Sequence, residues 1–314
     1  MAKKILKFFR SLIKIVLPFT FRLLIKLKLN RRVINFLSEK SYKSNEKNDF
    51  EKLIKNLLNG EKIIALDVGA QGGFNSDNFF SKKYNVFFKD ILIEPIEEEA
   101  KKIKKNEFVI NKGLWSKEEK KILYILGNRL GSSSMYEPEE KNFDLHNIEK
   151  KNYQNYKITD TVEVDCDTIS NQLSKLKIKD LNYLKIDTQG AELEILKGIG
   201  GYRPLLIKLE AHFFSMYKNV PNWHELVNYL YELNYVLIDW KGIGSHSTRI
   251  PAEADMIFIP NFNNNEGEEL IRTSKEKFIS LMMIFGQLKL LQVIMKRLKI
   301  SDNNLETLED QYFN

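Results

Sequence analysis

Acidic residues close three of the predicted strands, and a turn-forming segment follows each of them. Asp67 ends an apolar run and precedes Val-Gly-Ala-Gln-Gly-Gly. Glu94, with Pro95 after it, ends a second run, and Asp187 ends a third before Thr-Gln-Gly. In open α/β sheets, ligands bind in the crevice beyond the carboxyl ends of the parallel strands. We therefore expect the three carboxylates to meet at one site.

The glycine-rich turn after Asp67 carries the strongest signal for a ligand. Its small residues let the backbone approach a bound molecule, and a predicted helix over 75–80 would present free N–H groups. The turn lacks the G-x-G-x-x-G spacing, and Asp67 places negative charge where a dinucleotide pyrophosphate would lie. This favours a cationic or amine-bearing ligand over NAD. Glu94 stands where a carboxylate can accept both hydroxyls of a ribose.

The elements that must position these residues alternate along the chain. This alternation predicts an α/β fold, a mostly parallel sheet with helices on both faces. The predicted strands are 63–67, 90–94, 108–110, 121–126, 161–166, 181–187, 204–210, 235–240 and 256–259, and the predicted helices are 50–58, 96–105, 168–176, 191–196 and 222–233. Residues 127–160 are polar and predict a long, partly mobile loop.

Apolar residues after position 262 step by three and four, from Phe278 to Leu298, which predicts one long helix. We expect this helix to pack on the core or to pair with a second copy of the chain, giving a homo-oligomer. The chain then divides into a basic amphipathic arm (1–45), a central domain (46–262) and a C-terminal helical extension (263–314).

At the third strand-end acid the chain resembles a known family. Over about residues 60–260 it is similar to the FkbM family of S-adenosylmethionine-dependent methyltransferases. The resemblance rests on Asp67-Val-Gly-Ala-x-Gly, Glu94-Pro95, the serines at 132–134, Leu184-Lys-Ile-Asp187-x-x-Gly190-Ala-Glu192 and Ala254-Asp-Met-Ile-Phe. It implies a Rossmann-like class I methyltransferase sheet whose last strand is antiparallel. It also implies a hydroxyl acceptor, often on a sugar of a glycan, glycolipid or related metabolite.

The resemblance also assigns roles to individual residues. Asp67, Gly69, Ala70 and Gly72 would form the methionine side of an S-adenosylmethionine pocket. Glu94 would hold the ribose, Asn111 would face the adenine, and Asp187 would line the site near the methyl group. The chain departs from the family at Gln189, where many members carry Glu.

A sugar hydroxyl is a poor nucleophile, so we expect a general base near the acceptor. His212, just past the strand that ends near Glu210, is the candidate, because imidazole titrates near neutral pH. Glu210 or Asp187 could take the proton instead, and His212 could be purely structural.

We expect no resident metal. The four histidines lack metal-ligand spacing and Cys166 is the only cysteine. A metal-assisted reaction using Asp187 and Glu210 stays an alternative.

The positive charge of the chain is concentrated at its start. Residues 1–43 hold twelve of the 49 Lys and Arg but one of the 42 Asp and Glu, so they carry net +11 against −4 for the remainder. As an amphipathic helix this arm would lie on an anionic membrane, or it could pack on the body. No uncharged run is long enough to span a bilayer, and the acidic body argues against nucleic acid as a partner.

Together these features predict an O-methyltransferase of polysaccharide biosynthesis. It would be cytoplasmic, peripheral on the inner face of the membrane, and would act on a sugar hydroxyl of a surface glycan or lipid-linked sugar. A nucleotide-sugar oxidoreductase is opposed by Asp67 in the turn. A non-catalytic membrane-associated scaffold with the same fold would not need all three strand-end acids.

Overall fold

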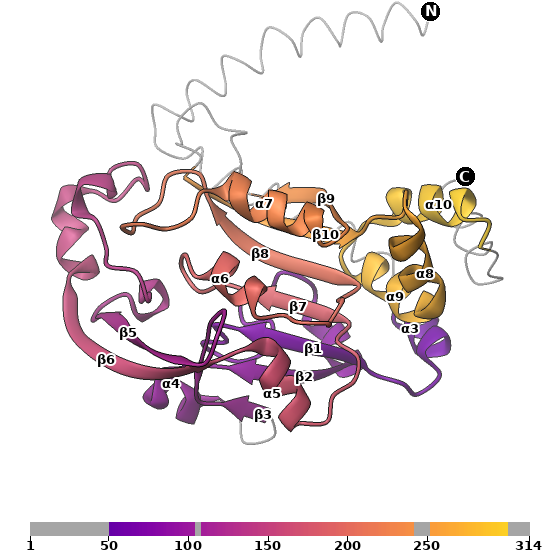
Figure 1. The fold of residues 1–314 in the computed structure, drawn as a ribbon, viewed down its shortest axis with the longest axis horizontal. Coiled ribbons are helices and arrows are strands. Elements are labelled where there is room, and N and C mark those ends of the chain that lie inside the picture. Colours follow the sequence, from indigo (N-terminus) through magenta and orange to yellow (C-terminus); the bar gives the residue numbers. More distant parts are fainter. Residues whose placement is uncertain (1–49, 104–107, 242–251, 301–314) are drawn as a thin grey trace, which may run out of the picture. The chain divides into compact units, whose positions relative to one another are not determined.

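The computed structural model describes residues 50–103, 108–241 and 252–300 (Figure 1). The described residues from Glu51 onward belong to one compact unit. The predicted basic arm (1–45) lies outside the described residues. The predicted domain limits at 45/46 and 262/263 stay predictions.

Seven strands form the main sheet, in the order β3-β2-β1-β7-β8-β10-β9. Their bounds are β1 Ile63–Val68, β2 Phe88–Ile93, β3 Phe108–Ile110, β7 Tyr183–Ile186, β8 Leu206–His212, β9 Tyr235–Lys241 and β10 Glu253–Pro260. β1, β2, β3, β7 and β8 pair in parallel, while β10 runs antiparallel to both β8 and β9. The predicted Rossmann-like sheet with an antiparallel last strand is confirmed.

The central strands are apolar because the sheet is covered on both sides. All four residues of β7 are buried, and so are five of the six in β1. Buried runs of this kind, apolar apart from Asp67 in β1 and Lys185 in β7, are typical of parallel strands with both faces covered. Because β1, β2 and β7 are parallel neighbours, their carboxyl ends lie at the same edge of the sheet. The residues that follow these strands therefore lie at that edge.

Helices flank the sheet in the order expected from the sequence. Their bounds are α3 Glu51–Leu58, α4 Glu97–Lys102, α5 Ile169–Lys175, α6 Glu192–Lys197, α7 Trp223–Glu232, α8 Asn265–Thr273, α9 Lys275–Ile284 and α10 Leu288–Arg297. α6 and α7 pack next to each other along β8 and β9, and α3 packs on α9. Figure 1 shows α3, α8, α9 and α10 gathered at one end of the sheet.

A second, three-stranded sheet stands beside the first, in the order β4-β6-β5. Its strands are β4 Gly113–Leu114, β5 Glu119–Leu126 and β6 Ile158–Asp167. The segment between β5 and β6 contains the 3-10 helices η2 Leu130–Ser132, η3 Glu140–Asn142 and η4 Lys150–Tyr156. The long loop predicted over 127–160 is irregular up to the start of β6, but it is anchored, because Phe143 and Tyr156 pack with Leu126, Met216 and Tyr217 into a small core.

The helix predicted over 75–80 is absent, and a series of turns takes its place. Asn75 and Asn78 both adopt left-handed backbone conformations (φ 53° each), which an α-helix does not contain. The Asn75 side chain donates to the Phe80 carbonyl (2.9 Å) and to Asn85 Oδ1 (3.1 Å). These bonds compete with helical ones, so the chain does not begin a helix directly after the glycine-rich turn.

The single long helix predicted near the C-terminus is two helices, α9 and α10. Gly286 has φ +71°, and its N–H donates to the Met283 carbonyl while the Gln287 N–H donates to Met282 (3.0 and 2.8 Å). This pair of bonds is the Schellman motif that ends helices. The turn keeps Phe285 against the body, with its ring 5.3 Å from those of Phe80 and Tyr183.

Candidate functional site

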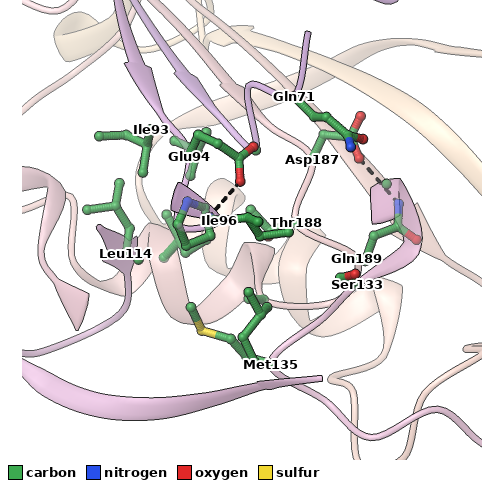
Figure 2. A pocket seen from close by; sticks show the side chains of 18 of the residues that line it. Gln71, Ile93, Glu94, Ile96, Leu114, Ser133, Met135, Asp187, Thr188 and Gln189 are labelled. Atoms are coloured by element: carbon green, nitrogen blue, oxygen red, sulfur yellow. Dashed lines mark hydrogen bonds between the residues drawn. The ribbon is translucent and has the colours of Figure 1, made fainter. Parts of the chain in front are cut away.

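A pocket opens at the carboxyl ends of β1, β2 and β7, where the sequence predicted a ligand site (Figure 2). It encloses about 890 Å³ of space, including open solvent at its mouth. Its lining includes Gly69, Gln71, Glu94, Ile96, Leu114, Gly131, Ser133, Met135, Lys185, Asp187, Thr188 and Gln189. Residues 130–135, which follow β5, therefore form the wall of the pocket opposite the main sheet.

Gly69 brings the first turn close to the end of β7. Its φ is +80°, and a Cβ at this position would lie 2.0 Å from the Asp187 carbonyl oxygen. The N–H groups of Gly69 and Ala70 both donate to the Ile93 carbonyl (3.0 and 3.1 Å), which ties the turn to β2. Gly69 lines the pocket, whereas Ala70 is buried behind it and Gly72 also lies outside the lining.

Asp67 lies one layer behind the pocket wall. It is 1% exposed, and its Oδ1 accepts a hydrogen bond from Lys185 Nζ at 2.9 Å. The two residues are directly opposed in the pairing of β1 with β7. Burial alone would lower the pKa of Lys185, but Asp67 and Asp187 outweigh it and raise that pKa. Lys185 therefore presents a positive charge at the pocket, held in place by Asp67.

Glu94 lines the pocket at the end of β2. Its carboxylate is 3% exposed, and Oε1 accepts a hydrogen bond from the Ile96 N–H at 2.9 Å (Figure 2). Burial raises the pKa of Glu94 to about 7. Asn111, predicted to face an adenine, instead donates from Nδ2 to the carbonyls of Glu94 and Pro95 (2.9 and 3.0 Å) and lies outside the lining.

The turn after β7 carries Asp187 and Gln189 into the pocket. Buried Glu192 fixes this turn by accepting from the N–H groups of Thr188 and Gly190 (2.9 and 3.3 Å). Gln189 Nε2 donates to Asp187 Oδ1 at 3.3 Å and to Glu210 Oε2 at 2.7 Å. The neutral amide thus separates two carboxylates, where a Glu at this position would add a third.

Glu210 and His212 lie beyond Gln189 and outside the pocket lining. His212 Nε2 is 3.7 Å from Glu210 Oε2, and His212 is 5% exposed. Burial, together with the neighbouring charge of Asp187 and Glu253, raises the pKa of Glu210 well above its ordinary value. Of the three predicted catalytic residues, therefore, only Asp187 borders the pocket.

Three residues of this region were not assigned roles from the sequence: Lys185, Gln189 and Glu253. Lys185 lies two positions before Asp187, which directly follows β7, so both side chains lie on the same side of the extended chain, with their charged groups 3.9 Å apart. This spacing is visible in the motif. Glu253 has no local signal, because only the pairing of β10 with β8 places it opposite His212.

A seven-stranded sheet with an antiparallel last strand, and a pocket at the carboxyl ends of its central parallel strands, defines the class of Rossmann-like methyltransferases. Within that class, the family model for the methyltransferase FkbM domain matches residues 67–237. The match covers more than half of the 314 residues, so the chain belongs to the FkbM methyltransferase family. Membership implies a methyl donor of the S-adenosylmethionine type. No curated protein matches the chain.

The described helices were compared with the length and apolar character of a membrane-spanning helix. Among residues 50–103, 108–241 and 252–300, no helix has the length and apolar character needed to cross a bilayer.

Proposed function

We propose that the protein is an S-adenosylmethionine-dependent O-methyltransferase that acts on a sugar hydroxyl. The observation that carries the proposal is Glu94, a buried carboxylate at the end of the second strand, facing a pocket closed by a glycine turn. A ribose offers two hydroxyl donors to such a carboxylate. The residues present therefore fit the nucleoside part of the methyl donor.

The charges around Lys185 fit the other end of the donor. The Lys185 ammonium lies at the pocket wall between Asp67 (2.9 Å) and Asp187 (3.9 Å), where it can bind the carboxylate of the methionine part. Backbone carbonyl groups near Gly69 can then hold its amino group. Bound in this way, S-adenosylmethionine supplies a methyl group carried by a positively charged sulfur.

The acceptor must lose a proton as its oxygen gains the methyl group. Asp187 borders the pocket, while Glu210 and His212 lie behind Gln189. We therefore propose Asp187, rather than His212, as the group that receives this proton. Asp187, Gln189 and Ser133 place several hydrogen-bonding groups on one wall, which suits an acceptor with several hydroxyls. A glycan or lipid-linked sugar has that chemistry.

The reaction is tested by incubating the full chain with deuteromethyl S-adenosylmethionine and panels of glycosides, phenols, amines and carboxylic acids. We expect an alkali-stable deuteromethyl ether on a glycoside, formed in equal amount with S-adenosylhomocysteine. Transfer to amines or carboxylic acids alone would contradict the proposed O-methylation. Asp187→Asn should lower kcat by about 10²-fold or more while S-adenosylhomocysteine still binds.

A further inference from the structure

Three ligand-type side chains meet at the carboxyl end of β8, on the far side of Gln189 from the pocket. Glu210 and His212 are two positions apart in β8 and therefore share one face of the sheet. Glu253, at the start of β10, is directly opposite His212 in the antiparallel pair, so its side chain lies on the same face. One ligand atom from each of the three lies within 4.8 Å of the others.

His212 is the unusual member of this group. Its side chain is buried, since the residue is only 5% exposed. Neither ring nitrogen has a hydrogen-bond partner among the residues that the structure describes. A buried polar group without a hydrogen bond is costly, and each one in a folded protein needs an explanation. The imidazole therefore points to a ligand between it and the nearby carboxylates.

The separation of His212 from Glu210 fits a shared cation better than a direct bond. Nε2 and Oε2 are 3.7 Å apart, which is too long for a hydrogen bond. Two atoms that each coordinate one Zn²⁺ at about 2.1 Å can lie up to about 4.2 Å apart. The third ligand, Glu253, has a carboxylate oxygen within 4.8 Å of the other two ligand atoms, and its Oε2 also lies 3.6 Å from His146 Nδ1.

The charges on this face also favour a cation at this point. Asp255, opposite Glu210 in the same strand pair, is neutralised by Lys208 at 2.9 Å. Glu210 instead receives only the neutral amide of Gln189 at 2.7 Å and the distant His212 ring among the partners described for it. A divalent cation would offset the two carboxylates and give the imidazole a partner.

We propose that Glu210, His212 and Glu253 bind one divalent transition-metal cation, Mn²⁺ or Zn²⁺, beside the methyl-donor pocket. Imidazole with two carboxylates suits these ions better than Mg²⁺ or Ca²⁺, which prefer all-oxygen sites. This proposal replaces the sequence-based expectation of no metal. Its role in methyl transfer rests on the proposed function: the cation would fix Glu210, which in turn holds Gln189 at the pocket wall. Cation binding itself does not depend on methyl transfer.

The test uses the full chain, stripped with EDTA, desalted, and titrated with MnCl₂ while free Mn²⁺ is followed by electron paramagnetic resonance. We expect one saturable site per chain, with hyperfine coupling to a ¹⁴N nucleus in the pulsed spectrum. His212→Gln should abolish that coupling and weaken binding at least about tenfold, and Glu253→Gln should weaken binding to a similar extent. A ZnCl₂ titration should displace the bound Mn²⁺.

His224→Gln is the matched control, because His224 is an exposed histidine of α7; this variant should bind like the wild type. Glu253 is partly exposed, so its variant keeps the test decisive if His212→Gln unfolds. No saturable binding, or equal binding by wild type and both site variants, would overturn the proposal. S-adenosylhomocysteine binding, measured on the same samples, reports separately on the proposed function.

Discussion

Glu94 is the residue whose charge decides how the pocket can receive a ribose. An ionised carboxylate accepts two hydroxyl hydrogen bonds, whereas a protonated one has lost part of that capacity. Burial raises the pKa of Glu94 from 4.5 to about 7, so the protein without ligand holds this carboxylate at the boundary between its two forms. Binding of a ribose would favour the ionised form and release a proton below pH 7.

The same shift makes the stability of the ligand-free protein depend on pH. A pKa raised by folding contributes stability that is fully present below pH 4.5 and lost as the pH rises through 7. We therefore expect Glu94→Gln, which cannot ionise, to gain up to about 3 kcal/mol relative to wild type between pH 4 and pH 8. Urea unfolding at several pH values measures this difference.

The neighbouring exposed Glu97 provides the control. Glu97→Gln removes a carboxylate that is paired with Lys101 at the surface, and it should produce a much smaller trend. Parallel stability curves for wild type and Glu94→Gln across this pH range would contradict the raised pKa.

Asp67 acts through Lys185, and this predicts a large cost in stability. Removing one partner of a buried ion pair leaves a charge without compensation, which typically costs 3–5 kcal/mol. Asp67→Asn should therefore lower the free energy of unfolding by about 3 kcal/mol. Glu61→Gln breaks the surface pair with Lys277 and should cost less than about 1 kcal/mol. Urea titration of both variants compares them, and equal losses would show that Asp67 is not held as described.

At the scale of elements, the turn between α9 and α10 sets how the C-terminal segment covers the sheet. Seven consecutive residues of α9, 278–284, are buried, so this helix is enclosed on all sides. Phe285 continues that contact through Phe80 and Tyr183. α9 is thus part of the body, and its buried residues are not available for pairing with a second chain.

Gly286 is needed at this turn because its φ is +71°. Gly286→Ala should destabilise the protein by about 1 kcal/mol, since the left-handed conformation is strained for residues with a Cβ. Gly201→Ala is the control: Gly201 lacks a positive φ, and a Cβ there would contact nothing within 4 Å. Thermal unfolding distinguishes the two, and a Gly286→Ala variant as stable as its control would contradict the Schellman turn.

Elements with local signals could be predicted from the sequence, and those set by distant contacts could not. Asp67, Glu94 and Asp187 were identified because each follows a short apolar run and precedes a glycine or proline turn. The helix predicted over 75–80 failed because the left-handed Asn75 and Asn78 bond to nearby groups instead. The long C-terminal helix failed for a related reason, since the pattern of apolar steps continues across Gly286.

In the candidate site, too, the contacts that depend on strand pairing could not be predicted from the sequence. The position of Asp67 behind Lys185 follows from the register of β1 against β7, and Glu253 reaches His212 through the register of β10 against β8. Neither register is visible in a single sequence. The contact of Asp67 with Lys185 and the position of Glu253 opposite His212 were therefore not predicted, while Glu94, at the end of its own strand, lines the pocket as expected.

For the whole molecule, the uneven charge predicts a dependence on membrane composition. We propose that the basic arm, with +11 over residues 1–43, binds anionic lipid at about 1 kcal/mol per basic residue near the surface. Replacing Lys3, Lys7, Arg10 and Lys14 by Glu in the full chain should abolish co-sedimentation with phosphatidylserine vesicles. High salt should weaken the wild-type interaction.

The control is a variant with the same change in net charge, made in the body instead of the arm. Glu replaces four exposed lysines of the body: Lys52, Lys117, Lys151 and Lys179. This variant should still sediment with the vesicles. Equal binding by the arm variant and the wild type would rule out the arm as the membrane contact.

The central claim is that the pocket at β1, β2 and β7 binds S-adenosylmethionine through Glu94, and calorimetric titration with S-adenosylhomocysteine at pH 7.5 tests it most directly. We expect micromolar binding by wild type and by Glu97→Gln, and binding at least about tenfold weaker, a loss of about 1.4 kcal/mol, by Glu94→Gln. Folded wild-type protein that gives no binding heat, or a Glu94→Gln variant that binds as tightly as the wild type, would contradict this account.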